Sequence, residues 1–144
     1  MANTYNSIAS PQLAVIGFGD LTAATALISR APITGTAGLT ACIPTTTADT
    51  AINKIDIKGL SSSSTAPTAA QLVGLWVSNG TTATLKTEIV VAAVTPSTTV
   101  ASFETSVIYD DFVLPIGSSL WLSTTVTTTA STTALGVTAH GRSM

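Results

Sequence analysis

The sequence predicts an all-β protein, a single-domain antiparallel β-sandwich or jelly roll of about eight strands with an extended N-terminal arm. Threonine makes up about one in five of the 144 residues, and Thr, Val and Ile are stiff at χ1 and suit pleated strands. Turn signals recur at intervals of roughly ten residues, the spacing typical of sandwiches and barrels. Because this length suits one domain, we expect an arm at 1–12 and a β-sandwich domain at 13–144.

The N-terminal half contains one clear strand pattern and three less regular segments. Residues 12–18 and 38–43 are short apolar runs and are expected to be strands. Residues 21–30 contain enough Ala and Leu for a helical turn or two, although their β surroundings favour a strand equally. Residues 52–60 alternate cleanly, with isoleucines facing one way and lysine and aspartate the other, so they predict a strand with one buried face.

A hairpin is expected in the middle of the chain, after a polar loop at 61–68. Residues 69–78 form a nearly continuous apolar run, which predicts a strand covered on both faces or a strand with one face in an interface. Asn79-Gly80 predicts a type I′ turn, because both residues tolerate positive φ. The return strand is expected at 82–91, with one face formed by Leu85, Thr87, Ile89 and Val91 and the other by Lys86 and Glu88.

The C-terminal third is predicted to contain three further strands. A break at 95–98 precedes a long and bulged strand at 102–114. A turn at 115–118 follows, and the chain closes with strands at 119–129 and 133–141. The first of these two strands is expected to direct Leu120, Leu122 and Val126 inward.

The charge of the chain excludes several classes of function. Only 8% of the residues are charged, and the five basic residues are scattered, so no stripe could neutralise several phosphates of a nucleic acid. The net charge of −2 provides little repulsion between copies, which favours a protein that functions inside an assembly. No apolar run approaches the ~18 residues needed to cross a membrane.

The N-terminus lacks a basic start and a long apolar segment, so we expect synthesis in the cytoplasm without export. Asn79-Gly80-Thr81 matches a glycosylation sequon. In the cytoplasm this sequence would carry no glycan, and the tight turn is the preferred interpretation.

Gly17-Phe18-Gly19 follows an apolar run and resembles the start of a dinucleotide-binding loop. That loop requires a third small residue and an acid about twenty residues further on. Thr22 occupies the third position, and residues 36–43 contain no acid. We therefore interpret these glycines as a loosened strand end or bulge, and we expect no cofactor.

Asp110 and Asp111, with Glu104 six residues upstream, form the only acidic cluster. Such carboxylates could bind Ca²⁺ or serve as acid and base in glycoside cleavage. However, adjacent residues of an extended strand point to opposite faces. A solvated bulge or loop edge is the alternative that we prefer.

Cys42 and His140 are the only cysteine and histidine, so neither a disulfide within the chain nor a Cys/His metal cluster is expected. Cys42 lies among apolar residues and is interpreted as a small buried core residue rather than a reactive thiol. No G-x-S-x-G motif accompanies His140, which is interpreted as a surface or interface residue. We therefore expect no catalytic residues and no metal site.

Trp76, Trp121 and Tyr109 could form an aromatic platform for a sugar. For residues in apolar strands, however, anchors of the core or of a subunit interface are commoner. Trp76 and Trp121 are therefore interface candidates, together with Tyr5, Ile8 and Pro11 of the proposed arm, which we expect to dock on a neighbouring subunit.

A set of segments occurs in a definite order between Asn53 and about Ala139: INKIDIKGL, LVGLWVSNGTTATLKTEIVV, AVTPSTTVASFE, FVLPIGSSLWLSTT and LGVTAHG. In this order the chain resembles small virion structural proteins of tailed bacteriophages. The resemblance implies a non-enzymatic decoration (cement) protein on the surface of the phage head. Its implied partners are the major capsid protein and copies of itself, as a homo-oligomer.

Three alternatives to a decoration protein remain. The resemblance also allows a head-fibre or tail component. The all-β prediction and the aromatic residues allow a carbohydrate-binding or adhesin module, although the lack of an export signal counts against it. An enzyme would require Glu104, Asp110 and Asp111 to lie together in a cleft.

Overall fold

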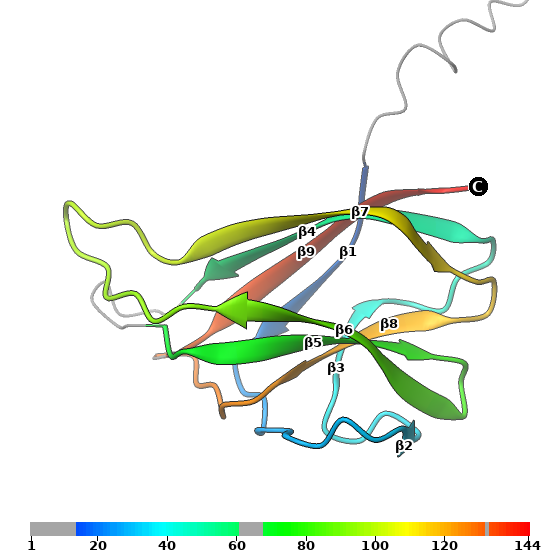
Figure 1. Cartoon of the computed structure of the whole chain (residues 1–144), viewed down its shortest axis with the longest axis horizontal. Helices are drawn as coiled ribbons and strands as arrows, with labels where there is room; N and C mark the ends of the chain where they lie inside the picture. Colours follow the sequence, from blue (N-terminus) through cyan, green and yellow to red (C-terminus); the bar gives the residue numbers. More distant parts are fainter. Residues whose placement is uncertain (1–13, 61–67, 132) are drawn as a thin grey trace, which may run out of the picture.

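The computed structural model describes residues 14–60, 68–131 and 133–144 (Figure 1). These residues form nine strands and no helix. The proposed arm, with Tyr5, Ile8 and Pro11, lies outside them. The strands are β1 (Ala14–Leu21), β2 (Ile33–Thr34), β3 (Thr40–Ile43), β4 (Thr50–Gly59), β5 (Gln71–Ser78), β6 (Thr82–Val91), β7 (Glu104–Leu114), β8 (Ser119–Thr124) and β9 (Leu135–Ser143).

The strands form two sheets that face each other, and every strand pairing is antiparallel (Figure 1). The first sheet has the order β1-β9-β4-β7, and the second has the order β2-β6-β5-β8-β3. Leaving out the two-residue β2, the chain pairs its first strand with its last and continues inward: β1 with β9, β3 with β8, β4 with β7 and β5 with β6. Successive pairs alternate between the sheets, which is the topology of a jelly roll. The predicted fold class is confirmed.

The core lies between the sheets, and the alternation of β4 explains how it forms. Ile55 and Ile57 are buried as predicted, while the polar residues between them face outward. A register shift at Asn53 also turns Ile52 inward. Burial of an aliphatic side chain of this size stabilises the fold by roughly 1.5–3 kcal/mol. The facing layer comes mainly from β5 and β8, with Val73, Leu75, Leu120 and Leu122.

A segment that we call the cover segment (residues 22–39) lies over the outer face of the second sheet (Figure 1). It is bound at one end by a hydrogen bond of 2.8 Å from Leu27 N to Thr124 O and near the hairpin by one of 2.7 Å from Gly35 N to Thr81 O. Between them, β2 pairs with β6. The segment is neither helix nor a continuous strand, so both predictions for 21–30 are wrong beyond Leu21, which ends β1.

The predicted hairpin between β5 and β6 is confirmed, but the predicted turn type is wrong. Only Gly80 has a positive φ, of 94°, whereas a type I′ turn requires positive φ at both central residues. Asn79 instead accepts hydrogen bonds at Oδ1 from the backbone N–H groups of Thr81 and Thr82, at 2.9 and 2.8 Å. The asparagine therefore stabilises the turn through its side chain rather than through its backbone conformation.

Two other strands differ from the sequence prediction. A bulge in β6 shifts the register, so that Trp76 pairs with Leu85 while Leu75 pairs with Thr87. Leu85 therefore lies on the outer face with Trp76 and not with Thr87 as predicted. At the C-terminal side, β8 ends at Thr124 rather than at residue 129, and Val126 is half-buried beyond the strand.

Candidate functional site

The outer face of the first sheet carries the largest group of charged side chains, and β4 places its centre. The period of two along this strand directs Lys54, Asp56 and Lys58 outward. The neighbouring strands add polar partners at the same level, since Asp56 pairs with Ser106 of β7 on one side and with Thr138 of β9 on the other. Residues far apart in the sequence therefore meet on one exposed surface.

Three polar side chains contact the carboxylate of Asp56. Ser106 Oγ donates to Oδ1, His140 Nε2 lies 2.8 Å from Oδ2, and Lys54 Nζ lies 3.4 Å from Oδ2. Burial by itself raises the pKa of Asp56, but the hydrogen bonds from Ser106 and His140 and the charge of Lys54 outweigh it and lower the pKa below its usual value. Asp56 is therefore ionised at neutral pH and is held in one orientation.

This arrangement differs from a catalytic triad although it contains Ser, His and Asp. In a triad the histidine lies between the serine and the aspartate and takes the serine proton. Here Asp56 lies between Ser106 and His140, so the carboxylate accepts from both and the histidine has no contact with the hydroxyl. The group orients side chains and balances charge, and it does not activate Ser106 as a nucleophile.

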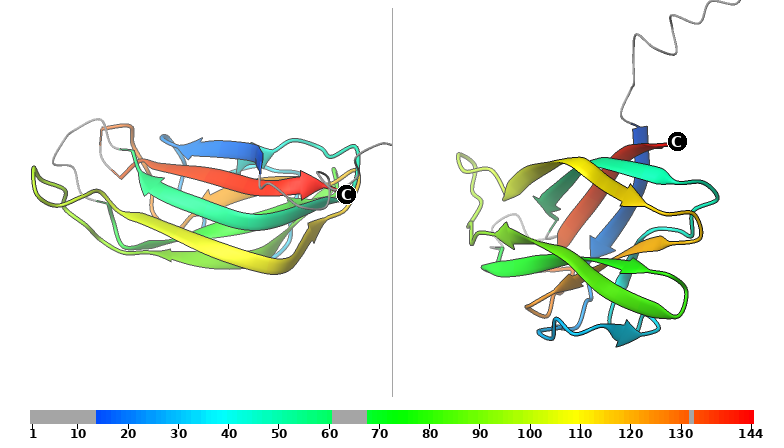
Figure 2. Two further views of the ribbon diagram at one scale, coloured as in Figure 1. Left: turned by 90° about the horizontal axis from the view of Figure 1, so that it is seen from above. Right: turned by 45° about the vertical axis from the view of Figure 1, so that its right-hand side comes forward.

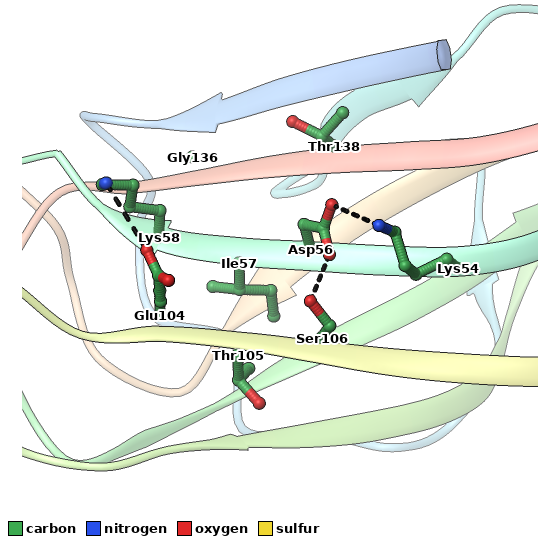
Figure 3. Close-up of a pocket in the computed structure, with 9 residues that line it drawn as sticks. All are labelled: Lys54, Asp56, Ile57, Lys58, Glu104, Thr105, Ser106, Gly136 and Thr138. Atoms are coloured by element: carbon green, nitrogen blue, oxygen red, sulfur yellow. Dashed lines mark hydrogen bonds and ion pairs between the residues drawn. The ribbon is translucent and has the colours of Figure 1, made fainter. Parts of the chain in front are cut away.

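An open hollow of about 570 Å³ runs beside this network on the same face. Figure 3 shows Lys54 and Ser106 turned toward Asp56, and Lys58 turned toward Glu104. The Lys58 Nζ to Glu104 Oε2 distance is 3.5 Å. Each lysine of the hollow thus has a carboxylate neighbour, and these four side chains together carry no net charge.

Large apolar side chains stand exposed on both edge strands of this face. Residues that pair across strands share a face, and Val15 pairs with His140 while Ile108 pairs with Lys54. The two edges therefore project apolar groups on the same side as the charge network. The exposed fractions are 58% for Val15 and 70% for Phe18 on β1, and 75% for Ile108 and 43% for Val113 on β7.

The two predicted interface tryptophans pair with each other on the outer face of the second sheet. Trp76 is only 1% exposed, and its Nε1 donates to Ser123 Oγ at 2.7 Å. Trp121 is half-buried and donates from Nε1 to Ser119 Oγ at 2.8 Å. Within one copy, Trp76 is therefore enclosed, whereas part of Trp121 remains accessible.

The three aromatic residues considered as a sugar platform are not brought together. Trp76 is enclosed, and Tyr109 belongs to the opposite sheet, where its ring meets the ring of Phe112 edge-on at 5.3 Å. A stacking platform needs exposed ring faces in one plane. The platform hypothesis for Trp76, Trp121 and Tyr109 is therefore wrong.

The acidic cluster separates in the structure. Ile108 pairs with Lys54 and Phe112 with Ile52, which leaves Asp110 and Asp111 in a bulge of β7 where both are exposed. Glu104 lies six residues away along the strand, about 20 Å at the usual rise, and pairs with Lys58. The predicted solvated bulge is confirmed. Within the described ranges, no group of three or more His, Cys, Asp or Glu side chains could hold a metal ion.

Gly17 and Gly19 lie within β1, and their place explains the glycine-rich motif. A Cβ atom at Gly17 would lie 2.3 Å from Cys42 O, and one at Gly19 would lie 2.6 Å from Ala41 O. The glycines therefore allow β1 to approach the backbone of β3, and a bulge in β1 between Val15 and Gly17 accompanies them. The interpretation as a bulged strand is confirmed.

Cys42 is buried, as predicted, in β3. Burial raises the pKa of its thiol to about 12. Because the thiolate is the reactive form, the side chain behaves as a core residue.

Sequence reasoning missed the network around Asp56, although one signal for it was present. The alternation of 52–60 placed Asp56 between two lysines on one face. Nothing local indicated that Ser106 and His140, which are 50 and 84 positions away, would complete it.

No protein-family model matches the chain, and neither a curated protein nor a solved structure matches it. The resemblance to phage virion proteins therefore stays a prediction. The part of the chain that the structure describes contains no helix long and apolar enough to span a membrane.

Proposed function

We propose that this protein is a non-enzymatic virion structural protein, a decoration protein that stabilises the head of a tailed phage through protein–protein contacts. The proposal rests on the resemblance of residues 53–139 to such proteins. In the structure, its main support is the outer face of the first sheet, where exposed apolar side chains surround charges that are already paired. The proposed partners are the major capsid protein and other copies of the chain, at the surface of the particle.

The chemistry of this face suits burial against another protein. An unpaired charge taken into an interface loses its hydration without compensation. Here Lys54 and Lys58 each keep a carboxylate neighbour, so a partner could cover them without isolating a charge. Ile108, at 75% exposure, would supply apolar area at the edge of the contact.

A particle-binding experiment tests the face. Purified protein is added to phage heads that lack it, and bound copies are counted after sedimentation. Ile108→Asp should reduce the affinity at least about tenfold, because one large apolar contact is replaced by a charge. The control Val90→Asp changes a side chain of similar exposure, 71%, on β6 and should bind normally.

Two results would contradict the proposal. The first is equal binding by the Ile108 and Val90 variants, which would show that the outer face of the first sheet takes no part in the contact. The second is the absence of the chain from purified particles, measured as copies per head by quantitative mass spectrometry. Imaging the same particles separates a head decoration protein from a head-fibre or tail component.

One observation favours a second candidate, a carbohydrate-binding module. The hollow on the first sheet is lined mainly by polar side chains, and exposed Phe18 pairs with Thr138 at its border. Asp56 uses three acceptor positions, which leaves about one of the roughly four of a carboxylate for a sugar hydroxyl. Saturable binding of the isolated protein on a glycan array, lost in Asp56→Asn, would support this function.

A further inference from the structure

An apolar cleft opens at the side of the sandwich, between the β5–β6 hairpin and the end of β7. This side cleft has a volume of about 250 Å³, enough for one large side chain but small for a complete ligand. Phe112 forms its deeper part and is only 3% exposed, while Val113 is 43% exposed. The complete lining is Val77, Thr84, Leu85, Lys86, Phe112 and Val113.

Lys86 places a positive charge at this apolar cleft. The bulge in β6 falls at this residue, and Lys86 Nζ lies 5.7 Å from the centre of the Phe112 ring. Arg30, Lys54 and Lys58 each have a carboxylate partner. In the described part of the chain, Lys86 has none within 4.0 Å, so its charge is available to an incoming carboxylate.

The opposite edge of the molecule carries a matching pair of groups. Phe18 and Asp20 lie on the outer face of β1, where they pair with Thr138 and Gly136, respectively. Phe18 is 70% exposed and Asp20 is also exposed. Residues two apart on a strand project on the same side about 7 Å from each other. Asp20, like Lys86, has no ion-pair partner within the described residues.

We propose that the side cleft of one copy receives Phe18 of a second copy, while Asp20 of the second copy pairs with Lys86 of the first. The β1 knob (Phe18 with Asp20) offers an apolar ring beside a carboxylate, and the side cleft offers an apolar depression beside an ammonium group. Size and charge therefore correspond. Both halves lack a charge partner in the single copy, and their contact would supply one to each.

The positions of the two halves determine the geometry of association. β1 and β7 are the opposite edge strands of the first sheet, as Figure 2 shows. A copy therefore cannot fill its own cleft, and the contact joins different surfaces of two copies. Such a head-to-tail contact continues from copy to copy and produces closed rings or open chains rather than a symmetric pair.

The first test measures self-association of the full chain by sedimentation velocity across a range of concentrations. Phe18→Ala and Lys86→Glu should each weaken association at least about tenfold. The control Val90→Ala truncates an apolar residue of similar exposure, 71%, on β6 of the other sheet and should change the affinity less than about twofold. A protein that stays monomeric up to about 1 mM overturns the proposal, as does association that only the Val90 variant abolishes.

The second test uses the head-to-tail geometry. The Phe18→Ala copy keeps an intact cleft and the Lys86→Glu copy keeps an intact knob, so an equimolar mixture should form one-to-one dimers that grow no further. A chain with both Asp20→Lys and Lys86→Glu should associate better than either single variant, because the reversed charges pair again. Failure of both rescues would refute the contact between Asp20 and Lys86.

The biological use of this contact depends on the proposed structural role. The contact itself does not, because both tests use free protein without particles. Lost particle binding by Ile108→Asp with normal self-association would concern the proposed function alone. Normal particle binding by a protein that never self-associates would refute only the proposed contact between the β1 knob and the side cleft.

Discussion

Replacing Trp76 by alanine tests how the jelly roll buries an aromatic side chain on the outer face of a sheet. Trp76 is 1% exposed although it does not belong to the core between the sheets. The cover segment lies over this face, and Trp76 Nε1 donates to Ser123 Oγ at 2.7 Å. The substitution would leave a cavity at an enclosed position of this face and remove the partner of a buried hydroxyl.

The expected loss of stability follows from these two contributions. Truncating a fully buried tryptophan to alanine costs about 3–5 kcal/mol. The unsatisfied Ser123 hydroxyl belongs to a residue that is 6% exposed, and such a group adds about 1–3 kcal/mol if no water replaces the indole. Using the lower total, we expect a decrease in Tm of about 10–20 °C for a chain of this size.

Urea unfolding followed by circular dichroism measures the loss in the free energy of unfolding, and thermal unfolding with the same signal measures the decrease in Tm. Trp121→Ala is the matched control, because Trp121 pairs with Trp76 on the same face but is only half-buried, and it should cost less than half as much. If the free energy of unfolding of Trp76→Ala lies within about 1 kcal/mol of the wild-type value, the burial and the hydrogen bond of the indole do not stabilise the fold as argued, and the reasoning fails. Trp76→Phe separates the hydrogen bond from the apolar burial.

Three further predictions concern single residues. Gly17→Ala should lower the free energy of unfolding by at least about 1–3 kcal/mol, because its Cβ would lie 2.3 Å from a backbone carbonyl oxygen; an unchanged urea midpoint would contradict this. The pKa of Asp56 is lowered in the folded state, so its stabilisation is complete above its ordinary pKa of 3.8 and is lost as the pH falls through the folded value. The stability difference between wild type and Asp56→Asn should therefore shrink on acidification below about pH 4; a constant difference would argue against it. Cys42, whose thiol pKa is raised to about 12 by burial, should react with a thiol reagent at pH 8 in urea but not in the native protein; equal rates would show an accessible thiol.

Local patterns in the sequence determined much of the fold. The alternation of residues 52–60 identified the buried and exposed faces of β4, and Asn79-Gly80 identified the hairpin. The acidic pair in the long strand 102–114 indicated a bulge, which β7 contains. These features depend on side-chain period and backbone conformation over a few residues, so they can be recognised without knowing the partners of each strand.

The tertiary structure alone decided which distant residues meet. Ser106, Asp56 and His140 converge because β4 lies between β7 and β9, an order that no local pattern specifies. Likewise, the apolar run of residues 69–78 is compatible with a subunit interface from the sequence, whereas the structure encloses Trp76 within a single copy. Strand order and the register of distant strands are set by the free energy of packing the whole sandwich. That free energy depends on contacts between residues far apart in the chain, which is why the sequence predicted the strands but not the surfaces that they form together.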